Sequence, residues 1–264
     1  METRENQPTA NEVPGVTTTQ SWINQMRAVT ISREYGSGGG EIAVRLAARL
    51  GWHLVNHEVV LGVARALGIS ETEAEAHDEH VDTLASRILS SLSMAQSAIA
   101  APLPVQLTTD EPAYDEARRR VVEGAIATGH VVIIGRGAQV LLASRRDVLH
   151  VRIIAPLEQR IEYVMRREGL NSAAARHRVE AKDRDRSRFL MSVHRKNPAD
   201  ASLYDLVVNT GVLHLNSVVD LLMLALERKA TRVTIPSEDL GPSVGLAPYT
   251  GSPGDIGSAS KTTE

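Results

Sequence analysis

A glycine-rich turn between a predicted strand and a predicted helix is the feature that most constrains the fold. The β-rich run 28–32 leads into Arg33-Glu34-Tyr35-Gly36-Ser37-Gly38-Gly39-Gly40, and apolar residues then recur at helical spacing over 41–50. Glycines let the backbone approach a ligand closely, and the following helix N-terminus attracts an anion. A tight turn that binds nothing is the alternative, but four glycines in five residues exceed what such a turn needs. The turn therefore predicts a phosphate site.

The rest of the chain alternates between strand and helix patterns. Further strands are predicted at 52–55, 131–134, 148–154 and 205–209, and further helices at 57–67, 81–101, 113–128, 157–168, 173–195 and 217–230, with a capping box opening one more at Ser70. Alternation of this kind predicts an α/β fold, a parallel sheet with helices on both faces. Such sheets bind ligands at the carboxyl ends of their strands.

Length and composition set the domain organisation and exclude several classes of protein. The chain has 264 residues, of which 42% are hydrophobic, so one body over 26–232 can hold a core, between a disordered segment at 1–25 and a flexible tail at 233–264. The absence of cysteine excludes disulfide scaffolds, iron–sulfur clusters and thiol catalysis. With no long apolar run and no secretory signal, we expect a cytoplasmic protein without membrane contact.

Arginines dominate two further segments. Arg136 lies between two glycines directly after the strand 131–134, where it can bind a phosphate or carboxylate or pair with a surface acid. Between Arg160 and Lys196 there are 11 Lys or Arg residues against 5 Asp or Glu residues, although the net charge of the chain is −3. This basic segment predicts a polyanionic ligand rather than a merely solvated helix face, and nucleic acid is the less favoured form of that ligand. His77 and His80 resemble a metal pair without further ligands, so no metal site is predicted.

Taken in order along the chain, these motifs resemble the cytidylate kinase-like family of nucleoside monophosphate kinases. The resemblance covers about 27–230 and rests on five motifs: Ile31–Gly39 with Glu41-Ile42, Ile134–Gly137, Ala155–Glu158 with Arg160, Asp183–Arg188, and Tyr204–Leu206. It implies a P-loop kinase fold with a helical monophosphate-binding insertion at 56–128 and a basic helical lid at 168–197. It also implies ATP and Mg²⁺ as ligands.

The resemblance assigns roles to individual residues. Arg136, Asp185 and Arg188 would hold the nucleoside monophosphate, and Arg184 and Arg186 would line the transferring phosphates. The phosphate loop that binds ATP would consist of Gly36, Ser37, Gly38, Gly39 and Gly40. Lid arginines suit phosphoryl transfer, which depends on positioning and charge stabilisation.

The chain also departs from the family's usual pattern. Gly39 and Gly40 stand where a P-loop carries its Lys and its Ser or Thr. Gly137 replaces the acid after the motif arginine, Ile134 replaces an acid before it, and Ala181 replaces an upstream lid arginine. We hypothesise that Arg33, at the end of the first strand, supplies the missing catalytic cation.

The favoured function is transfer of the γ-phosphate of ATP to a nucleoside monophosphate, with CMP or dCMP as the first candidates. A regulatory protein that binds nucleotides without catalysis would also fit the lost Lys, and the C-terminal tail could then contact a protein partner. A kinase for another small metabolite would fit the lost acids at 134 and 137.

Overall fold

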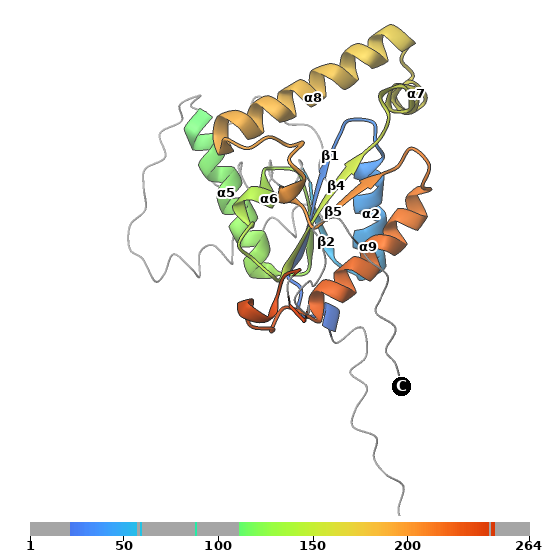
Figure 1. The fold of residues 1–264 in the computed structure, drawn as a ribbon. Coiled ribbons are helices and arrows are strands. Elements are labelled where there is room, and N and C mark those ends of the chain that lie inside the picture. Colours follow the sequence, from blue (N-terminus) through green and yellow to red (C-terminus); the bar gives the residue numbers. More distant parts are fainter. Residues whose placement is uncertain (1–21, 57–58, 60–87, 89–110, 243, 246–264) are drawn as a thin grey trace, which may run out of the picture. The chain divides into compact units, whose positions relative to one another are not determined.

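The computed structural model describes residues 22–56, 59, 88, 111–242 and 244–245 (Figure 1). The helices predicted at 57–67 and 81–101, the capping box at Ser70 and the histidine pair at 77 and 80 lie outside these residues. The chain divides into two compact units, residues 1–233 and 234–264. In the second unit the structure describes one short 3₁₀ turn, η2 (Ser237–Asp239).

The first unit is built on a parallel five-stranded sheet. Its strands are β1 (Ala28–Arg33), β2 (His53–Val55), β3 (Val131–Ile134), β4 (Val148–Ile154) and β5 (Leu206–Asn209), in the order β2-β3-β1-β4-β5. All four strand pairs are parallel, so every strand ends at the same edge. The register places Ser32 of β1 beside Arg152 of β4, and Ile31 beside Ile134 of β3.

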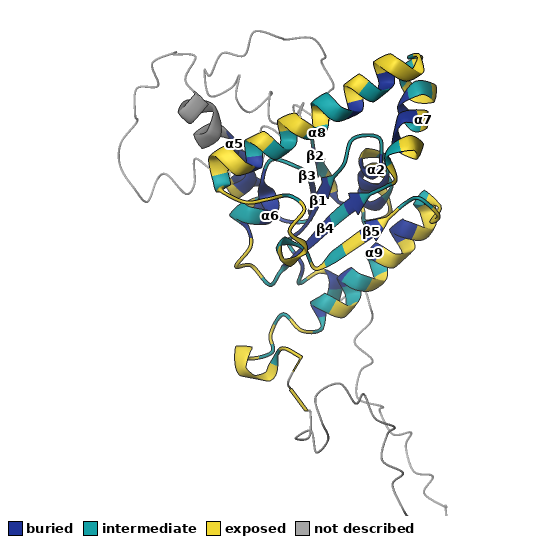
Figure 2. Ribbon diagram, turned by 45° about the horizontal axis from the view of Figure 1, so that its top comes forward, coloured by how far each residue is buried: buried dark blue, intermediate teal, exposed yellow. Residues whose placement is uncertain are grey.

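Helices cover both faces of this sheet, which confirms the predicted α/β class. Helices α2 (Gly39–Leu50) and α9 (Leu215–Ala230) lie on one face, and α5 (Glu111–Thr128) and the short α6 (Ala138–Leu141) lie on the other (Figure 1). Buried side chains separate the layers, for example Leu46, Leu222 and Leu226 on the first face and Val121 with Ile133 on the second (Figure 2). Two short elements, α6 and η1 (Ala201–Leu203), are additional to the predicted ones.

Two helices after β4 carry the basic segment. Helix α7 (Leu157–Glu168) packs against α8 (Ser172–His194) through a small cluster that includes Ile161, Val164 and Val179. The N-cap of α8 is Asn171, whose side chain accepts a hydrogen bond from the Ala174 N–H at 2.9 Å. Helix α8 crosses above the edge where the strands end (Figure 1).

The boundaries at the N-terminal side need a correction. Ile23 is 2% exposed and packs into the core, so the ordered body begins before residue 26. Helix α5, the last part of the predicted insertion 56–128, packs directly against the sheet beside β3. The insertion and the lid at 168–197 stay predictions, as does the flexible tail. Among the described helices, none has the length and apolar character needed to cross a membrane.

Candidate functional site

The glycine-rich turn forms a tightly held loop between β1 and α2. The Ser37 hydroxyl donates to the Glu34 carbonyl at 2.9 Å, and the Thr210 hydroxyl donates to the Ser37 carbonyl at 2.9 Å. Gly38 caps α2 with a φ of 76° and offers the helix no side-chain hydrogen bond. The first N–H groups of α2 are therefore not occupied by a capping side chain, as an anion-binding helix start requires.

The side chain of Arg33 explains why position 39 is glycine. A Cβ atom on Gly39 would lie 2.7 Å from Cβ and 3.2 Å from Cγ of Arg33. Real Cβ atoms do not approach other carbons that closely, so a lysine cannot stand at position 39 while Arg33 keeps its place. A side chain at 39 therefore competes for volume with the Cβ and Cγ atoms of the residue at 33, which here is an arginine.

Arg33 reaches from this loop toward the turn after β3. A Cβ atom on Gly135 would lie 2.4 Å from Nη1 of Arg33, so the guanidinium group lies against that turn. Burial, together with the charges of Arg186 and Arg136, lowers the pKa of Arg33 to about 9. Arg33 stays charged at neutral pH, in surroundings that an anion would make more favourable.

The turn after β3 holds Arg136 in a strained conformation. Gly135, Arg136 and Gly137 have successive φ angles of 70°, 64° and 66°. Positive φ is costly for a residue with a side chain, of order 1–3 kcal/mol, and such strain clusters at functional sites. A Cβ atom on Gly137 would lie 2.4 Å from Nε2 of His194, at the end of α8. An acid at 137 would therefore need the His194 ring to move and would itself adopt a strained positive φ.

A cavity of about 270 Å³ lies between the ends of β1, β3 and β4 and helix α8. We call it the arginine cavity, since its walls include Arg33, Arg136, Arg152 and Arg186, with Ser32, Glu34, Gln139, Asp183, Ser187, Phe189 and Asn197 among the other lining residues. Its volume lies near the lower end of the roughly 300–1,000 Å³ usual for ligand pockets. Four arginines in so small a volume suit a phosphorylated ligand.

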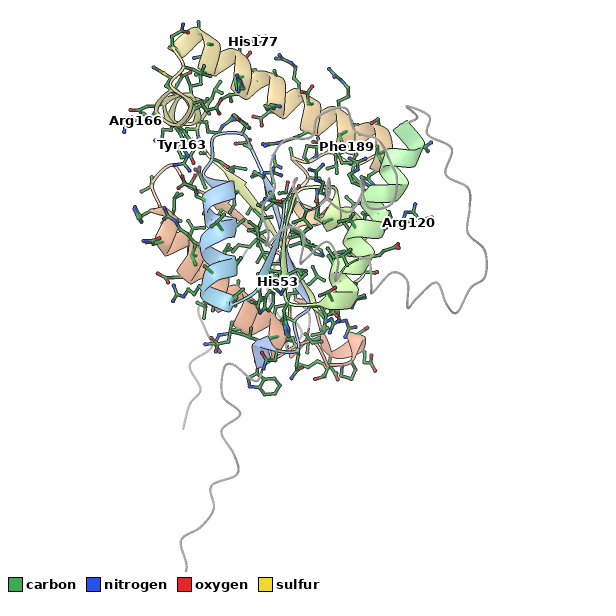
Figure 3. The ribbon with its side chains drawn as sticks, turned by 180° about the vertical axis from the view of Figure 1, so that it is seen from behind. His53, Arg120, Tyr163, Arg166, His177 and Phe189 are labelled. Carbon is green, nitrogen blue, oxygen red and sulfur yellow. The ribbon has the colours of Figure 1, made fainter. Side chains whose placement is uncertain are left out.

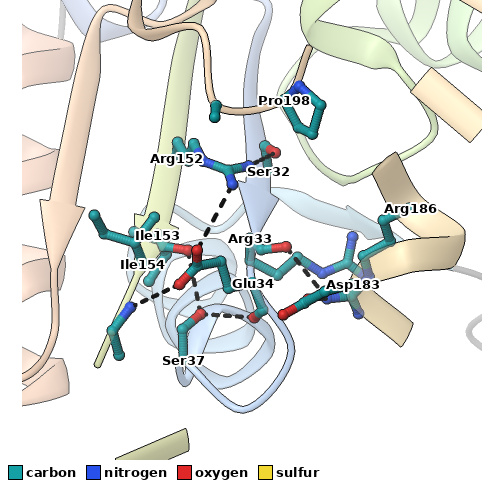
Figure 4. A network of polar contacts seen from close by, with 12 residues as sticks. Ser32, Arg33, Glu34, Ser37, Arg152, Ile153, Ile154, Asp183, Arg186 and Pro198 are labelled. Carbon is teal, nitrogen blue, oxygen red and sulfur yellow. Dashed lines mark hydrogen bonds and ion pairs between the residues drawn. The ribbon is translucent and has the colours of Figure 1, made fainter. Parts of the chain in front are cut away.

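Polar contacts attach α8 to the phosphate loop (Figure 4). Asp183 accepts hydrogen bonds from the Tyr35 N–H at 2.7 Å and from Nη1 of Arg160 at 2.5 Å. Arg186 donates to the carbonyl of Arg33 at 3.2 Å. Burial lowers the pKa of Arg186, and the nearby Asp183 partly offsets this. The contacts hold two α8 side chains at the end of β1.

A second set of contacts fixes the floor of the arginine cavity (Figure 4). Nη1 of Arg152 donates to the Ser32 hydroxyl at 3.2 Å, and its Nη2 lies 4.0 Å from the Glu34 carboxylate. Glu34 also lies 3.4 Å from Nε of Arg160 and accepts from the Ala155 N–H at 3.2 Å. Both carboxylates of the cavity are thus already paired with arginines.

The predicted residues of α8 divide between two sides of the helix. Arg186 faces the arginine cavity, whereas Arg184 and Arg188 line a wider groove with Arg160, about 510 Å³ in volume. Asp185 pairs with Arg188 at 3.5 Å, and both side chains are exposed, by 62% and 74%. The structure therefore brings Arg33, Arg136 and Arg186 together but leaves Asp185 and Arg188 outside that cavity.

The glycines of the loop border a third space. Gly36, Ser37 and Gly38 line a pocket of about 230 Å³ together with Tyr163, Thr210 and His214. Figure 3 shows Tyr163 at α7 and Phe189 at the far end of α8, near α5. The loop and the residues beside it thus line two spaces, this pocket and the arginine cavity. No group of three or more potential metal-ligating side chains occurs among the described residues.

Sequence reasoning missed two side chains of the arginine cavity. Arg152 had a signal, because a charged residue interrupts the apolar strand 148–154. Gln139 had no sequence signal, since a single glutamine after a glycine-flanked arginine matches no motif. It is only 3% exposed.

Comparison with known proteins places the chain in a family. The sequence model of the "Cytidylate kinase-like family" matches residues 28–212. A cytidylate kinase of Ignicoccus hospitalis is 26% identical over 196 residues, which are 74% of this chain and 96% of that protein. A cytidylate kinase of Methanopyrus kandleri is 33% identical over 115 residues, 40% of this chain and 59% of that protein.

Two further proteins are similar to this chain, one over a small part of its own length and one in fold. A uronate isomerase of Corynebacterium glutamicum is 36% identical over 110 residues, 42% of this chain but only 21% of that protein. The crystal structure of an uncharacterized protein from Eubacterium ventriosum covers 76% of this chain and 99% of its own, with a TM-score of 0.51 and 18% identity. The chain thus spans 21% and 59% of the uronate isomerase and the Methanopyrus kinase, and at 18% identity the solved structure supports the fold alone.

Proposed function

The chain belongs to the cytidylate kinase-like family, and on this premise we propose that it transfers the γ-phosphate of ATP to a nucleoside monophosphate, with CMP or dCMP favoured. The observation that carries the proposal is the exchange between Gly39 and Arg33. The aliphatic base of Arg33 occupies the volume beside the loop from which a lysine at 39 is excluded, and its guanidinium group lies against the turn at Gly135. Loss of the Lys is therefore accompanied by a replacement charge, which favours an active enzyme over a regulator that only binds nucleotide.

The proposed donor site is the phosphate loop. The backbone of Gly36, Ser37, Gly38, Gly39 and Gly40 and the start of α2 would bind the phosphates of ATP. Arg33 would stabilise the charge that develops on the transferring phosphoryl group. Arg186 would add charge from α8, and Arg184, which lines the wider groove with Arg160, would do so after α8 moves. The lid brings these groups over the loop and excludes water.

The proposed acceptor site is the arginine cavity. Arg136, held by the strained turn, would bind the acceptor phosphate beside Arg33. Asp185 and Arg188 remain proposed acceptor ligands by resemblance. In the described structure they pair with each other on the exposed side of α8, so their use requires α8 to move.

Mg²⁺ would accompany ATP. Gly40 lacks the hydroxyl that usually helps to hold the ion, and Glu34 and Asp183 are paired with arginines. The phosphate oxygens of ATP would therefore supply most of its ligands. The ion would neutralise charge on the phosphates.

The test is ADP release in the presence of ATP and Mg²⁺ over a panel of monophosphates and small metabolites. We expect turnover with CMP or dCMP. Arg33→Gln should reduce it by about 10³-fold or more, the scale of losing an arginine that stabilises the transferring phosphate, and Arg136→Gln should raise the KM of the acceptor. Arg166→Gln is the matched control, because Arg166 is exposed on α7 and, among the described residues, pairs with Glu162.

Different results would replace the proposal with a specific alternative. Saturable nucleotide binding without turnover for any acceptor would identify a regulatory nucleotide-binding protein. Turnover only with a metabolite that is not a nucleotide would identify a different acceptor class. Unchanged turnover in Arg33→Gln would show that Arg33 does not replace the Lys.

A further inference from the structure

Gln139 is a buried polar residue that the proposed reaction has not used. It lies in α6, directly after the strained turn that holds Arg136, and it lines the arginine cavity. Its exposure is 3%, and the structure gives its side-chain amide no hydrogen-bond partner among the described residues. Buried amides are normally hydrogen-bonded, so this one calls for an explanation.

Gln139 lines the cavity, and its amide is not fully closed off from solvent. Within the described part of the chain, no buried side-chain nitrogen or oxygen that is closed off from solvent lacks a partner. An unpartnered amide must therefore keep access to solvent, and the arginine cavity is the space that Gln139 lines. A ligand in that cavity would meet one acceptor and two donors on this side chain.

Four of the neighbouring polar side chains, those of Ser32, Asn197, Glu34 and Asp183, have other partners. Ser32 is contacted by Arg152 and by the Tyr204 hydroxyl at 3.2 Å, and the Asn197 oxygen accepts from the Ala199 N–H at 2.9 Å. The carboxylates of Glu34 and Asp183 are held by Arg160. Gln139 thus offers a neutral donor and acceptor beside four cations that suit a phosphate.

Position 137 has no side chain, and the His194 ring lies against it. His194 occupies the position that a side chain on Gly137 would need. A carboxylate there would accept hydrogen bonds only, whereas an amide both donates and accepts. Gln139, two positions further on, is the polar side chain that follows this turn and lines the cavity.

We propose that Gln139 determines specificity by hydrogen-bonding the base of the acceptor while the arginines bind its phosphate. The ligand class is a nucleoside monophosphate whose base presents a donor next to an acceptor, as the pairing edge of a pyrimidine does. A glutamine amide matches such an edge with two hydrogen bonds. This inference rests on the proposed function and adds the group that reads the base.

The experiment compares equilibrium binding of CMP and of ribose 5-phosphate, which keeps the sugar and phosphate but lacks the base. Both are titrated into the full chain and into Gln139→Met, which keeps the length of the side chain and removes the amide. We expect the Kd of CMP to rise about tenfold, as for loss of one or two net hydrogen bonds, and the Kd of ribose 5-phosphate to stay within about twofold. Gln139→Asn keeps the amide on a side chain that is one carbon shorter, and it should raise the Kd of CMP in the same way. This variant replaces Gln139→Met if the Met variant does not fold.

The other outcomes overturn the inference in distinguishable ways. An unchanged Kd for CMP in a folded variant shows that Gln139 does not contact the acceptor. Equal weakening of CMP and ribose 5-phosphate shows a contact to the sugar or a structural role. In both cases the proposed function stands. If the unmodified chain binds no nucleoside monophosphate, the proposed function and this inference fail together.

Discussion

Two glycines of the site face side chains that belong to other helices or strands. Gly39 faces Arg33, and Gly137 faces His194. At each position a larger residue of the family pattern has been lost, and at each a side chain from another element fills its volume. At the residue scale, the departures from the family pattern are therefore coupled exchanges rather than simple losses.

A buried histidine gives a prediction at the same scale. The Thr30 hydroxyl donates to Nδ1 of His150 at 2.8 Å, and Nε2 donates to the Leu142 carbonyl at 3.2 Å, an arrangement of the neutral ring. Burial lowers the pKa of His150 in the folded chain, with Asp205 partly offsetting the effect. Below about pH 6.5 the unfolded chain then binds more protons, so the free energy of unfolding falls as the pH drops through the lowered pKa.

His150→Leu should therefore make the free energy of unfolding less sensitive to pH. Urea titrations at pH 7, 6 and 5 measure this quantity. At pH 7 the free energy of unfolding of the variant should be lower by about 1–3 kcal/mol, since Thr30 loses its partner. Between pH 7 and 5, however, the free energy of unfolding should fall less in the variant than in the unmodified chain. Parallel curves for the two proteins would contradict the prediction.

At the scale of elements, the unit β1–loop–α2 carries the donor site. Its sequence specifies a strand end, a loop and a helix start locally, but the choice of cation depends on which residue fills the volume between strand and helix. Arg33 and a Lys at 39 cannot both occupy it. This unit can therefore place a positive charge beside the loop in two ways, with an arginine at 33 or with a lysine at 39.

An exchange of the two residues tests this account. Gly39→Lys alone should lower the melting temperature and abolish turnover, because its Cβ would overlap Arg33. The double variant Arg33→Gly with Gly39→Lys should regain folding and part of the turnover, since the lysine then has room. Melting temperatures and ADP release measure both effects. A Gly39→Lys variant as stable as the unmodified chain would contradict the proposed competition.

At the scale of the whole first unit, α8 is joined to the sheet edge by few side chains. Its buried residues are Ala175, Val179 and Leu190, which is little apolar surface for so long a helix. Asp183 contributes two of its polar attachments. We therefore expect the position of α8 to depend on Asp183 more than on packing.

Asp183→Asn should loosen α8. The expected loss of unfolding free energy is about 1–3 kcal/mol, the range for hydrogen bonds to a charged group, and amide hydrogen exchange should become faster over 172–194. Glu180→Gln is the matched control, because Glu180 lies on the same helix in exposed pairs with Arg176 and Arg184 at 3.9 and 3.7 Å and should cost less than about 1 kcal/mol. Equal exchange in the two variants would show that Asp183 does not anchor the helix.

The sequence by itself determined the layers of the fold and the loop at its centre. The strands at 131–134 and 148–154 and the helix at 157–168 have the predicted bounds. These features follow from local physics, because β-branched runs, helical spacing and glycines act within a few residues. The same holds for Arg136, which its flanking glycines single out. The start of the last helix was predicted less well: the predicted helix begins at 217, whereas α9 begins at Leu215, after its N-cap His214.

Only the tertiary structure decided which side chains share a space. Arg152 joins the site because the register sets it beside Ser32, and Gln139 joins it because three residues with positive φ turn the chain after β3. Arg186 reaches the cavity while Arg188 points into the outer groove, because α8 lies on the sheet edge in one orientation that its weak apolar stripe does not specify. Strand register and helix docking depend on contacts between distant residues, whereas sequence patterns report contacts between near ones.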